Sequence, residues 1–150
     1  RAVEIQARRV GDQGAILILL DADDDCAASI GPRLLGRAVV ARPDRRIGVV
    51  VAVREFEAWL LAGIVPLRGE RTLPNDLAAP DDPEAIRDAK GWLDARMERG
   101  YSATIEQPKL TARFDLEGAR RADSFDKLVR EMGRLLKRPV PERPAPPTGP

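Results

Sequence analysis

A run of six apolar residues, 15–20, constrains the fold of this chain more than any other feature, because it leads directly into a group of carboxylates. An uninterrupted apolar run of this length is typical of a strand buried on both faces, and such strands belong to parallel sheets covered by helices. The acids that follow are Asp21, Asp23, Asp24 and Asp25. In open α/β sheets, ligands lie beyond the carboxyl ends of the strands. The sequence therefore predicts an α/β protein with a ligand site at this point.

The spacing of the first two acids favours a hard divalent cation. Asp21 and Asp23 project to the same side if the chain stays extended. Mg²⁺ binds through one or two carboxylates and completes its coordination with water and substrate phosphate, so we expect Mg²⁺ or Mn²⁺ at this pair. The alternative for Asp24 and Asp25 is that they cap a helix beginning near Cys26, where each acid would stabilise the helix by about 0.3–1 kcal/mol.

A second apolar run, residues 47–53, predicts a second buried strand. Between the two runs, residues 26–40 carry an apolar stripe at helical spacing that is interrupted at Gly31-Pro32. The order strand, helix, strand predicts a parallel crossover. A two-stranded parallel sheet is too small to stand alone, so we expect a first strand to precede residue 1.

The C-terminal half is predicted to be helical. A helix is expected to start at Asp82-Pro83-Glu84 and to end at Gly100, and Asp123-Ser124 is expected to cap a last helix that ends near Leu136. Residues 138–150 hold six of the 13 prolines and are predicted to form a disordered or extended tail. Residues 1–137 are accordingly predicted to form a single domain.

Composition excludes several classes of function. The chain has no His, which removes His-based general bases, Ser-His-Asp nucleophiles and most catalytic zinc sites. Its single Cys excludes an internal disulfide and any site with paired Cys ligands. The formal net charge of +1 neither favours nor excludes nucleic acid as a partner. No signal peptide and no membrane-spanning apolar run is visible, so we expect a cytoplasmic protein with no membrane association.

Several segments together match the pattern of one bacterial family. They are residues 18–26, residues 53–60, Pro83-Glu84 through Lys90, Tyr101, Gln107 and Ser124-Phe125. In these residues, which extend over nearly the whole chain, the sequence resembles domain-of-unknown-function family 4276. That family in turn resembles the Toprim fold of topoisomerases, primases and overcoming-lysogenization-type nucleases. The resemblance implies a Toprim-like, Rossmann-like parallel sheet followed by a helical C-terminal half.

The resemblance also implies an acidic Mg²⁺ site, made from a Glu after a first strand and an Asp-x-Asp after a later one. Asp21 and Asp23 match the Asp-x-Asp pair, and Asp25 occupies the next alternate position, where some Toprim proteins have a further acid. Glu57, followed by Ala58-Trp59, matches the family's own acidic motif. The Toprim Glu would lie before residue 1, so we expect an N-terminally incomplete domain, and catalysis by these 150 residues alone is left open.

The function implied is Mg²⁺-dependent phosphoryl transfer or nuclease-type cleavage of nucleic acid. Asp21, Asp23 and Asp25 would hold the metal, Glu57 would orient a second metal or a water, and Lys90 would contact a phosphate as a point charge. Family members often appear beside ATPase genes, which implies an ATPase partner protein and a role in phage defence. The alternative is a non-catalytic interaction or regulatory subunit that docks on an ATPase partner.

Two of these residues also have structural alternatives. Glu57 would serve equally well as the partner of a buried Arg such as Arg54. Lys90 interrupts an apolar helical face, where a salt bridge to Glu84 or to the acidic cluster competes with phosphate binding. Glu55 is expected to be solvated, because a spacing of two residues on a helix turns it about 200° away from Glu57.

Overall fold

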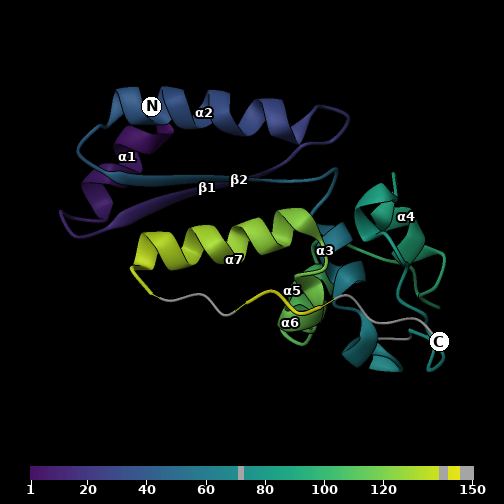
Figure 1. Cartoon of the computed structure of the whole chain (residues 1–150). Helices are drawn as coiled ribbons and strands as arrows, with labels where there is room; N and C mark the ends of the chain where they lie inside the picture. The colour runs from purple at the N-terminus through teal and green to yellow at the C-terminus, as the bar shows by residue number, and fades with distance from the viewer. Residues whose placement is uncertain (71–72, 139–141, 146–150) are drawn as a thin grey trace.

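Two parallel strands form the centre of the N-terminal half, as the computed structural model shows (Figure 1). Strand β1 (Ala15–Asp21) pairs along its whole length with β2 (Arg46–Ala52), so that the two strands end side by side at Asp21 and Ala52. The structure describes residues 1–70, 73–138 and 142–145, and within them the sheet has these two strands. The prediction of an α/β protein with adjacent parallel strands is confirmed.

Helices cover both faces of β2 because the successive apolar residues of this strand point alternately to the two faces of the sheet. Val49 and Val51 pack with Ile30 beneath α2 (Ala27–Ala41), whereas Val50 packs with Phe125 of α7 (Asp123–Leu136). Figure 1 shows α2 on one side of the strands and α7 on the other. The strand is buried from Ile47 to Ala52, as its continuous apolar sequence predicts.

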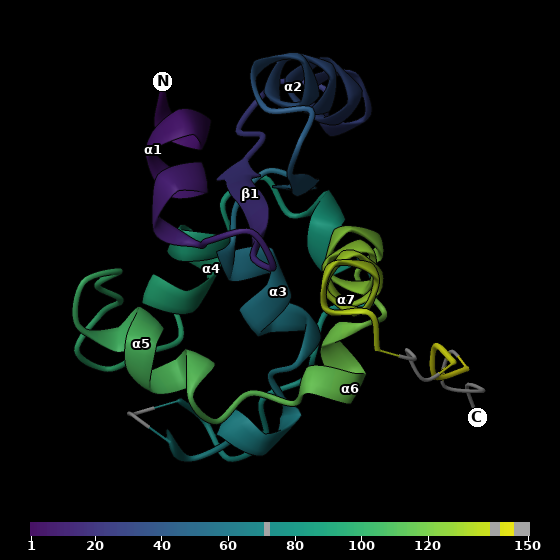
Figure 2. The ribbon, with the colours of Figure 1, turned by 90° about the vertical axis from the view of Figure 1, so that its left-hand side faces the viewer.

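Strand β1 is less covered than the sequence predicts. Figure 2 shows helix α1 (Ala2–Arg9) beside this strand. Ala7 of α1 packs with Ile16, but Leu19 remains 46% exposed. The prediction of a strand buried on both faces is therefore wrong for β1. The physical reason is that β1 pairs with β2 along one edge only, and no described helix covers Leu19.

Helix α2 runs without interruption through Gly31-Pro32, where a break was expected. Pro32 is the sixth residue of the helix, so it leaves only the carbonyl of Ala28 without an intrahelical donor. Both Ala28 and Pro32 are exposed to solvent, which can hydrate that carbonyl. The cost of the proline is therefore small enough for the helix to continue.

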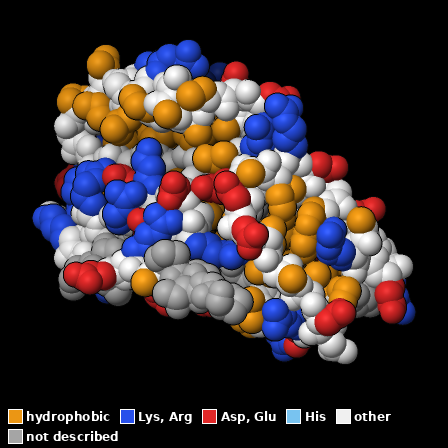
Figure 3. Space-filling model, turned by 45° about the vertical axis from the view of Figure 1, so that its right-hand side comes forward, with side chains coloured by type: hydrophobic (Ala, Val, Ile, Leu, Met, Phe, Trp, Pro, Cys, Tyr) orange, Lys and Arg blue, Asp and Glu red, His pale blue; other side chains and the backbone are white. Residues whose placement is uncertain are grey.

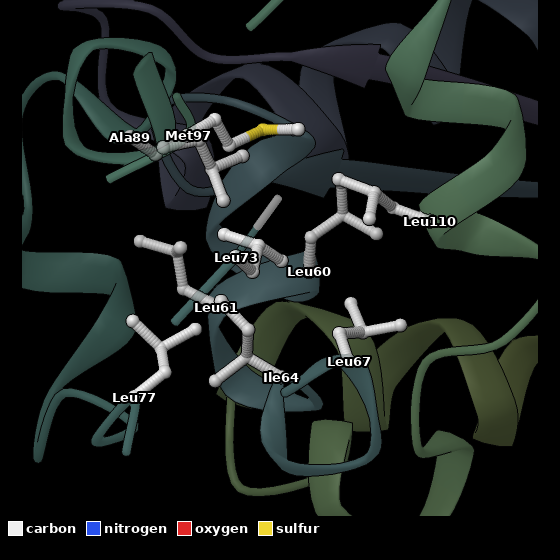
Figure 4. Close-up of a cluster of buried hydrophobic side chains, with 10 residues drawn as sticks. Leu60, Leu61, Ile64, Leu67, Leu73, Leu77, Ala89, Met97 and Leu110 are labelled. Atoms are coloured by element: carbon white, nitrogen blue, oxygen red, sulfur yellow. The ribbon is translucent and has the colours of Figure 1, made fainter. Parts of the chain in front are cut away.

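The C-terminal half is helical, as predicted, and is built around a second apolar core. Figure 4 shows that core, with Leu60, Leu61 and Ile64 at its centre. Its short helices are α3 (Glu57–Ala62), η1 (Val65–Leu67), η3 (Pro83–Ala85), α4 (Ala89–Asp94), α5 (Glu106–Thr111) and α6 (Leu116–Ala119).

The single helix predicted from Asp82 to Gly100 is instead two separate pieces, η3 and α4. Asp82 caps the first piece by accepting a hydrogen bond from the Ala85 N–H. Asp88 then starts a new helix by accepting a hydrogen bond from the Gly91 N–H at 2.7 Å. A second capping acid within the segment therefore restarts the helix, and the apolar periodicity alone did not reveal this.

The start of α7 is capped by a residue distant in sequence. The sequence predicts capping by Asp123-Ser124, but the carboxylate of Glu84 accepts hydrogen bonds from the backbone N–H groups of Asp123 (2.8 Å) and Ser124 (3.2 Å). Ser124 Oγ instead accepts a hydrogen bond from Trp59 Nε1 at 2.7 Å. These contacts tie η3 and α3 to α7.

Part of the predicted tail is described, and it lies against the C-terminal helices. Arg143 donates hydrogen bonds to Asp123 Oδ1 (2.7 Å) and to the Arg121 carbonyl (2.6 Å). Residues 139–141 and 146–150 of the predicted tail lie outside the described residues. In the described part of the chain, no helix is long and apolar enough to cross a membrane.

Candidate functional site

The loops that follow β1 and β2 are joined to each other at the carboxyl edge of the sheet. The Ala22 N–H donates to the Ala52 carbonyl at 3.0 Å, and the Asp23 N–H donates to the Arg54 carbonyl at 2.9 Å. The acids after β1 and the Glu residues after β2 are therefore held at one end of the sheet. This is the end at which open α/β proteins bind their ligands.

Two non-glycine residues in these loops have left-handed backbone conformations. Asp23 has φ 50° and Arg54 has φ 62°. Such a conformation costs an L-residue roughly 1–2 kcal/mol, and strain of this kind concentrates at functional sites. The chain therefore does not stay extended after Asp21. The expectation that Asp21 and Asp23 project to the same side required an extended chain, so the structure does not support it.

Glu57, the first residue of α3, is the most buried acid of the site, with 1% of its surface exposed. Its Oε1 accepts hydrogen bonds from the Tyr101 hydroxyl (2.9 Å) and from Gln107 Nε2 (3.2 Å). Burial and the hydrogen bond to Glu57 raise the pKa of Tyr101 far above its usual value, so the phenol stays protonated and acts as a donor. Glu57 therefore does not pair with Arg54, which was the structural alternative; Arg54 lies near Asp24 instead.

The second carboxylate oxygen of Glu57, Oε2, is buried and accepts no hydrogen bond from the described residues. Its nearest cation among them is Lys90 Nζ at 3.7 Å. A buried charged oxygen without a hydrogen bond is costly, because it has lost its hydration without a full replacement. Such an atom fits a bound cation better than it fits a purely structural role.

Lys90, near the start of α4, connects Glu57 to Glu55. Its Nζ donates a hydrogen bond to Glu55 Oε1 at 2.9 Å, and its backbone N–H donates to Glu55 Oε2 at 3.3 Å. The hydrogen bond to Glu55 is the main reason that the pKa of Lys90 is raised. The expectation that Glu55 is solvated is wrong: its side chain is 17% exposed, since the residue precedes α3 and is not on its outer face. The ion pair considered for Lys90 with Glu84 does not form, because Glu84 caps α7.

Asp21 ends β1 beside this group. Its pKa is raised, first by partial burial and then by the negative charge of Glu57, while Lys90 and a backbone hydrogen bond from Phe56 act in the opposite direction. The carboxylate of Asp21 thus lies in the electrostatic field of both Glu57 and Lys90. Of the three Asp residues predicted as metal ligands, Asp21 is the one that the structure couples to the predicted catalytic pair.

Asp24 and Asp25 lie on the outside of the loop. Asp24 is 92% exposed and lies 3.6 Å from Arg54 and 3.9 Å from Arg87. Neither acid caps α2, whose N-cap residue is Cys26 and whose first turn has no side-chain cap. The capping alternative is therefore wrong, and the assignment of Asp23 and Asp25 as metal ligands stays a prediction.

The donor set fits a hydrated metal ion better than a fully protein-ligated one. Among the described residues, no three acidic, His or Cys side chains form a ready-made metal site. Mg²⁺ does not require such a site, because it commonly keeps several waters and uses one or two carboxylates. Asp21 and the free oxygen of Glu57 would supply those two carboxylates.

Three residues of the site were not assigned a role by sequence reasoning. Glu55 was set aside by a helical-wheel argument that assumed the wrong start for α3. Tyr101 and Gln107 lie 44 and 50 residues after Glu57 and reach it only through the packing of the helical half. The available signal was their presence in the family pattern, which identifies residues but assigns no contact.

Comparison with protein families agrees with the resemblance seen in the sequence. A family model described as "Domain of unknown function (DUF4276)" matches residues 2–133, so the chain belongs to this family. A search of curated proteins and a search of solved structures found no match.

Proposed function

We propose that this member of the DUF4276 family is a divalent-metal-dependent enzyme of phosphoryl transfer or phosphodiester cleavage that acts on nucleic acid. One observation carries the proposal: at the carboxyl edge of a parallel sheet, beside Asp21, Glu57 has a buried oxygen that accepts no hydrogen bond from the described part of the chain. An acid kept in this state lowers stability unless a ligand uses it. A divalent cation is the simplest ligand that does so.

Each residue of the site has a defined task in this proposal. Asp21 and Glu57 would hold Mg²⁺ or Mn²⁺, which supplies charge neutralisation at phosphate oxygens and activation of water. Tyr101 and Gln107 hold one Glu57 oxygen, and this orients the other oxygen. Since the chain has no His, proton transfer falls to a carboxylate or to activated water.

Cationic side chains at the same edge of the sheet support a phosphate-containing substrate. Arg54 and Arg87 lie within 4 Å of Asp24, and Lys90 is 44% exposed. Over the face shown in Figure 3, Lys and Arg side chains are interspersed with Asp and Glu and do not form one continuous basic surface. A local contact with a few phosphates fits this distribution better than a long nucleic-acid track. The choice of nucleic acid comes from the Toprim-like resemblance. A role in phage defence and an ATPase partner come from the ATPase genes that often lie beside those of family members.

Calorimetric titration of Mn²⁺ and Mg²⁺ into the chain tests the metal site. We expect saturable binding that is lost in Asp21→Asn and in Glu57→Gln, with folding verified by circular dichroism. Asp24→Asn is the matched control, because Asp24 lies in the same loop but on its exposed side. Metal-dependent cleavage of labelled DNA and RNA would then identify the substrate.

Absence of saturable binding by the wild-type chain would contradict the proposed metal site. The same result would favour the alternative of a non-catalytic subunit that docks on an ATPase partner.

A further inference from the structure

Two carboxylates contact a single ammonium group in the site. Lys90 Nζ lies 2.9 Å from Glu55 Oε1 and 3.7 Å from the unpartnered Glu57 Oε2. The negative charges of Glu57, Glu55 and Asp21 all raise the pKa of Lys90, which places Asp21 in the same electrostatic group. The ammonium is thus the cation to which Glu57 Oε2 lies nearest among the described residues.

The charges of this group do not balance. The group has three acidic side chains and one ammonium, so Lys90 alone cannot pair with all of them. Lys90 is therefore an incomplete counterion, and its contact with Glu57 at 3.7 Å is longer than a good hydrogen bond.

Lys90 is also free to leave. Its side chain is 44% exposed, whereas that of Glu57 is 1% exposed. A Lys side chain is a point charge on a flexible stem with four carbons, so it can turn toward solvent or toward a phosphate with no backbone movement. The buried acid is fixed by Tyr101 and Gln107, while the cation beside it is mobile.

From these contacts we infer that Lys90 is a resident counterion of Glu55 and Glu57, and that a divalent metal bound by Asp21 and Glu57 displaces it. The inference rests on the proposed metal-dependent function. In the metal-free protein Lys90 reduces the repulsion among the acids. When the metal enters, Lys90 moves outward, where its charge is available to a substrate phosphate.

Competition predicts that removal of the ammonium strengthens metal binding. Lys90→Met keeps the length and the apolar stem and removes the charge, and we expect it to bind Mn²⁺ at least about tenfold more tightly than the wild type. Lys90→Arg, the matched control, keeps the charge and is expected to bind Mn²⁺ as the wild type does. Without metal, Lys90→Met should have a lower Tm than the wild type, and Mn²⁺ should restore it.

A second experiment uses the unmodified protein and so does not depend on the folding of a variant. The chain has four lysines, Lys90, Lys109, Lys127 and Lys137, which peptide mass spectrometry can follow separately during acylation. We expect saturating Mg²⁺ to increase the acylation rate of Lys90 several-fold, while the other three lysines serve as internal references and do not change.

The outcomes separate this inference from the proposed function. If Glu57→Gln abolishes Mn²⁺ binding but Lys90→Met binds no more tightly than the wild type, the metal site stands and displacement of Lys90 is wrong. An acylation rate for Lys90 that Mg²⁺ leaves unchanged would also contradict displacement. If neither the wild type nor Lys90→Met binds Mn²⁺, both the metal-dependent function and the inference fail.

Discussion

Two buried carboxylates in this molecule have opposite surroundings. Asp126 in α7 is 5% exposed, and both its oxygens are paired: Oδ1 with the buried Arg120 at 2.9 Å and Oδ2 with Arg130 at 2.9 Å. Glu57 in α3 is buried to a similar degree, yet within the described residues only one of its oxygens accepts hydrogen bonds. Full pairing of both oxygens is typical of a buried acid with a structural role, as at Asp126. An oxygen left without a hydrogen bond, as at Glu57, indicates an acid that binds a ligand.

The comparison predicts its largest effect on stability at Asp126. Asp126→Ala leaves the Arg120 guanidinium buried without its main acid, so we expect the free energy of unfolding to fall by about 3–5 kcal/mol. Urea denaturation measures this loss. The stabilisation that Mn²⁺ adds should be unchanged in the variant, and a reduced increment would show that the two acids are not independent.

Glu57→Gln should affect metal binding and leave the stability of the metal-free protein almost unchanged. Because the variant removes a half-satisfied charge, we expect the free energy of unfolding of the metal-free protein to change by less than about 1 kcal/mol. The increase in Tm that Mn²⁺ gives the wild type should disappear, and differential scanning fluorimetry with and without Mn²⁺ measures it. A large loss of stability in the metal-free protein would place Glu57 with Asp126, as a structural acid.

Tyr101→Phe tests whether the orientation of Glu57 matters. The variant keeps the ring and removes one hydrogen bond to Oε1, so we expect metal affinity to fall about tenfold, as for other residues that orient a ligand. Stability should fall by about 1 kcal/mol. Calorimetric titration gives the affinity. If the metal affinity is unchanged while stability falls by the same amount, Tyr101 has only a structural role and does not orient Glu57 for metal binding.

The smallest effect is expected at Asp21, and it depends on pH. A raised pKa means that ionisation of Asp21 disfavours the folded state, so its stabilising contribution is present below the usual pKa of 3.8 and is lost as the pH rises through the folded-state pKa. Asp21→Asn should therefore raise the stability of the metal-free protein at pH 7, by no more than about 0.5 kcal/mol because the side chain is partly exposed.

Thermal melts of the wild type and of Asp21→Asn between pH 3 and pH 8 test this sign. The difference in Tm should shrink toward zero below about pH 4. A difference that stays constant across the range would mean that the effect does not arise from ionisation of Asp21.

Sequence reasoning succeeded where a local pattern determines the structure. The apolar runs predicted both strands and their parallel pairing, and the acids at the end of β1 identified the edge of the sheet where the site lies. It failed where distant residues decide the outcome. Glu84 caps α7 from 39 residues away, and Tyr101 reaches Glu57 across 44.

The local failure at Asp23 has a different cause. The hydrogen bond between the Asp23 N–H and the Arg54 carbonyl joins two loops, and both residues adopt positive φ there. Asp tolerates a left-handed conformation better than most residues, but nothing in a group of four Asp residues indicates which one adopts it. Side chains alternate between the two faces only within β1, which ends at Asp21, so this rule could not be applied to Asp23.

A crystal structure of the chain with Mn²⁺, with the metal located by anomalous scattering, tests the central claim most directly. We expect a peak at coordination distance, about 2.1 Å, from Glu57 Oε2, with Asp21 as a second ligand and the Lys90 ammonium moved away from Glu57. A Glu57 Oε2 that accepts a hydrogen bond from a buried water, with Mn²⁺ bound only at exposed acids such as Asp24, would contradict it.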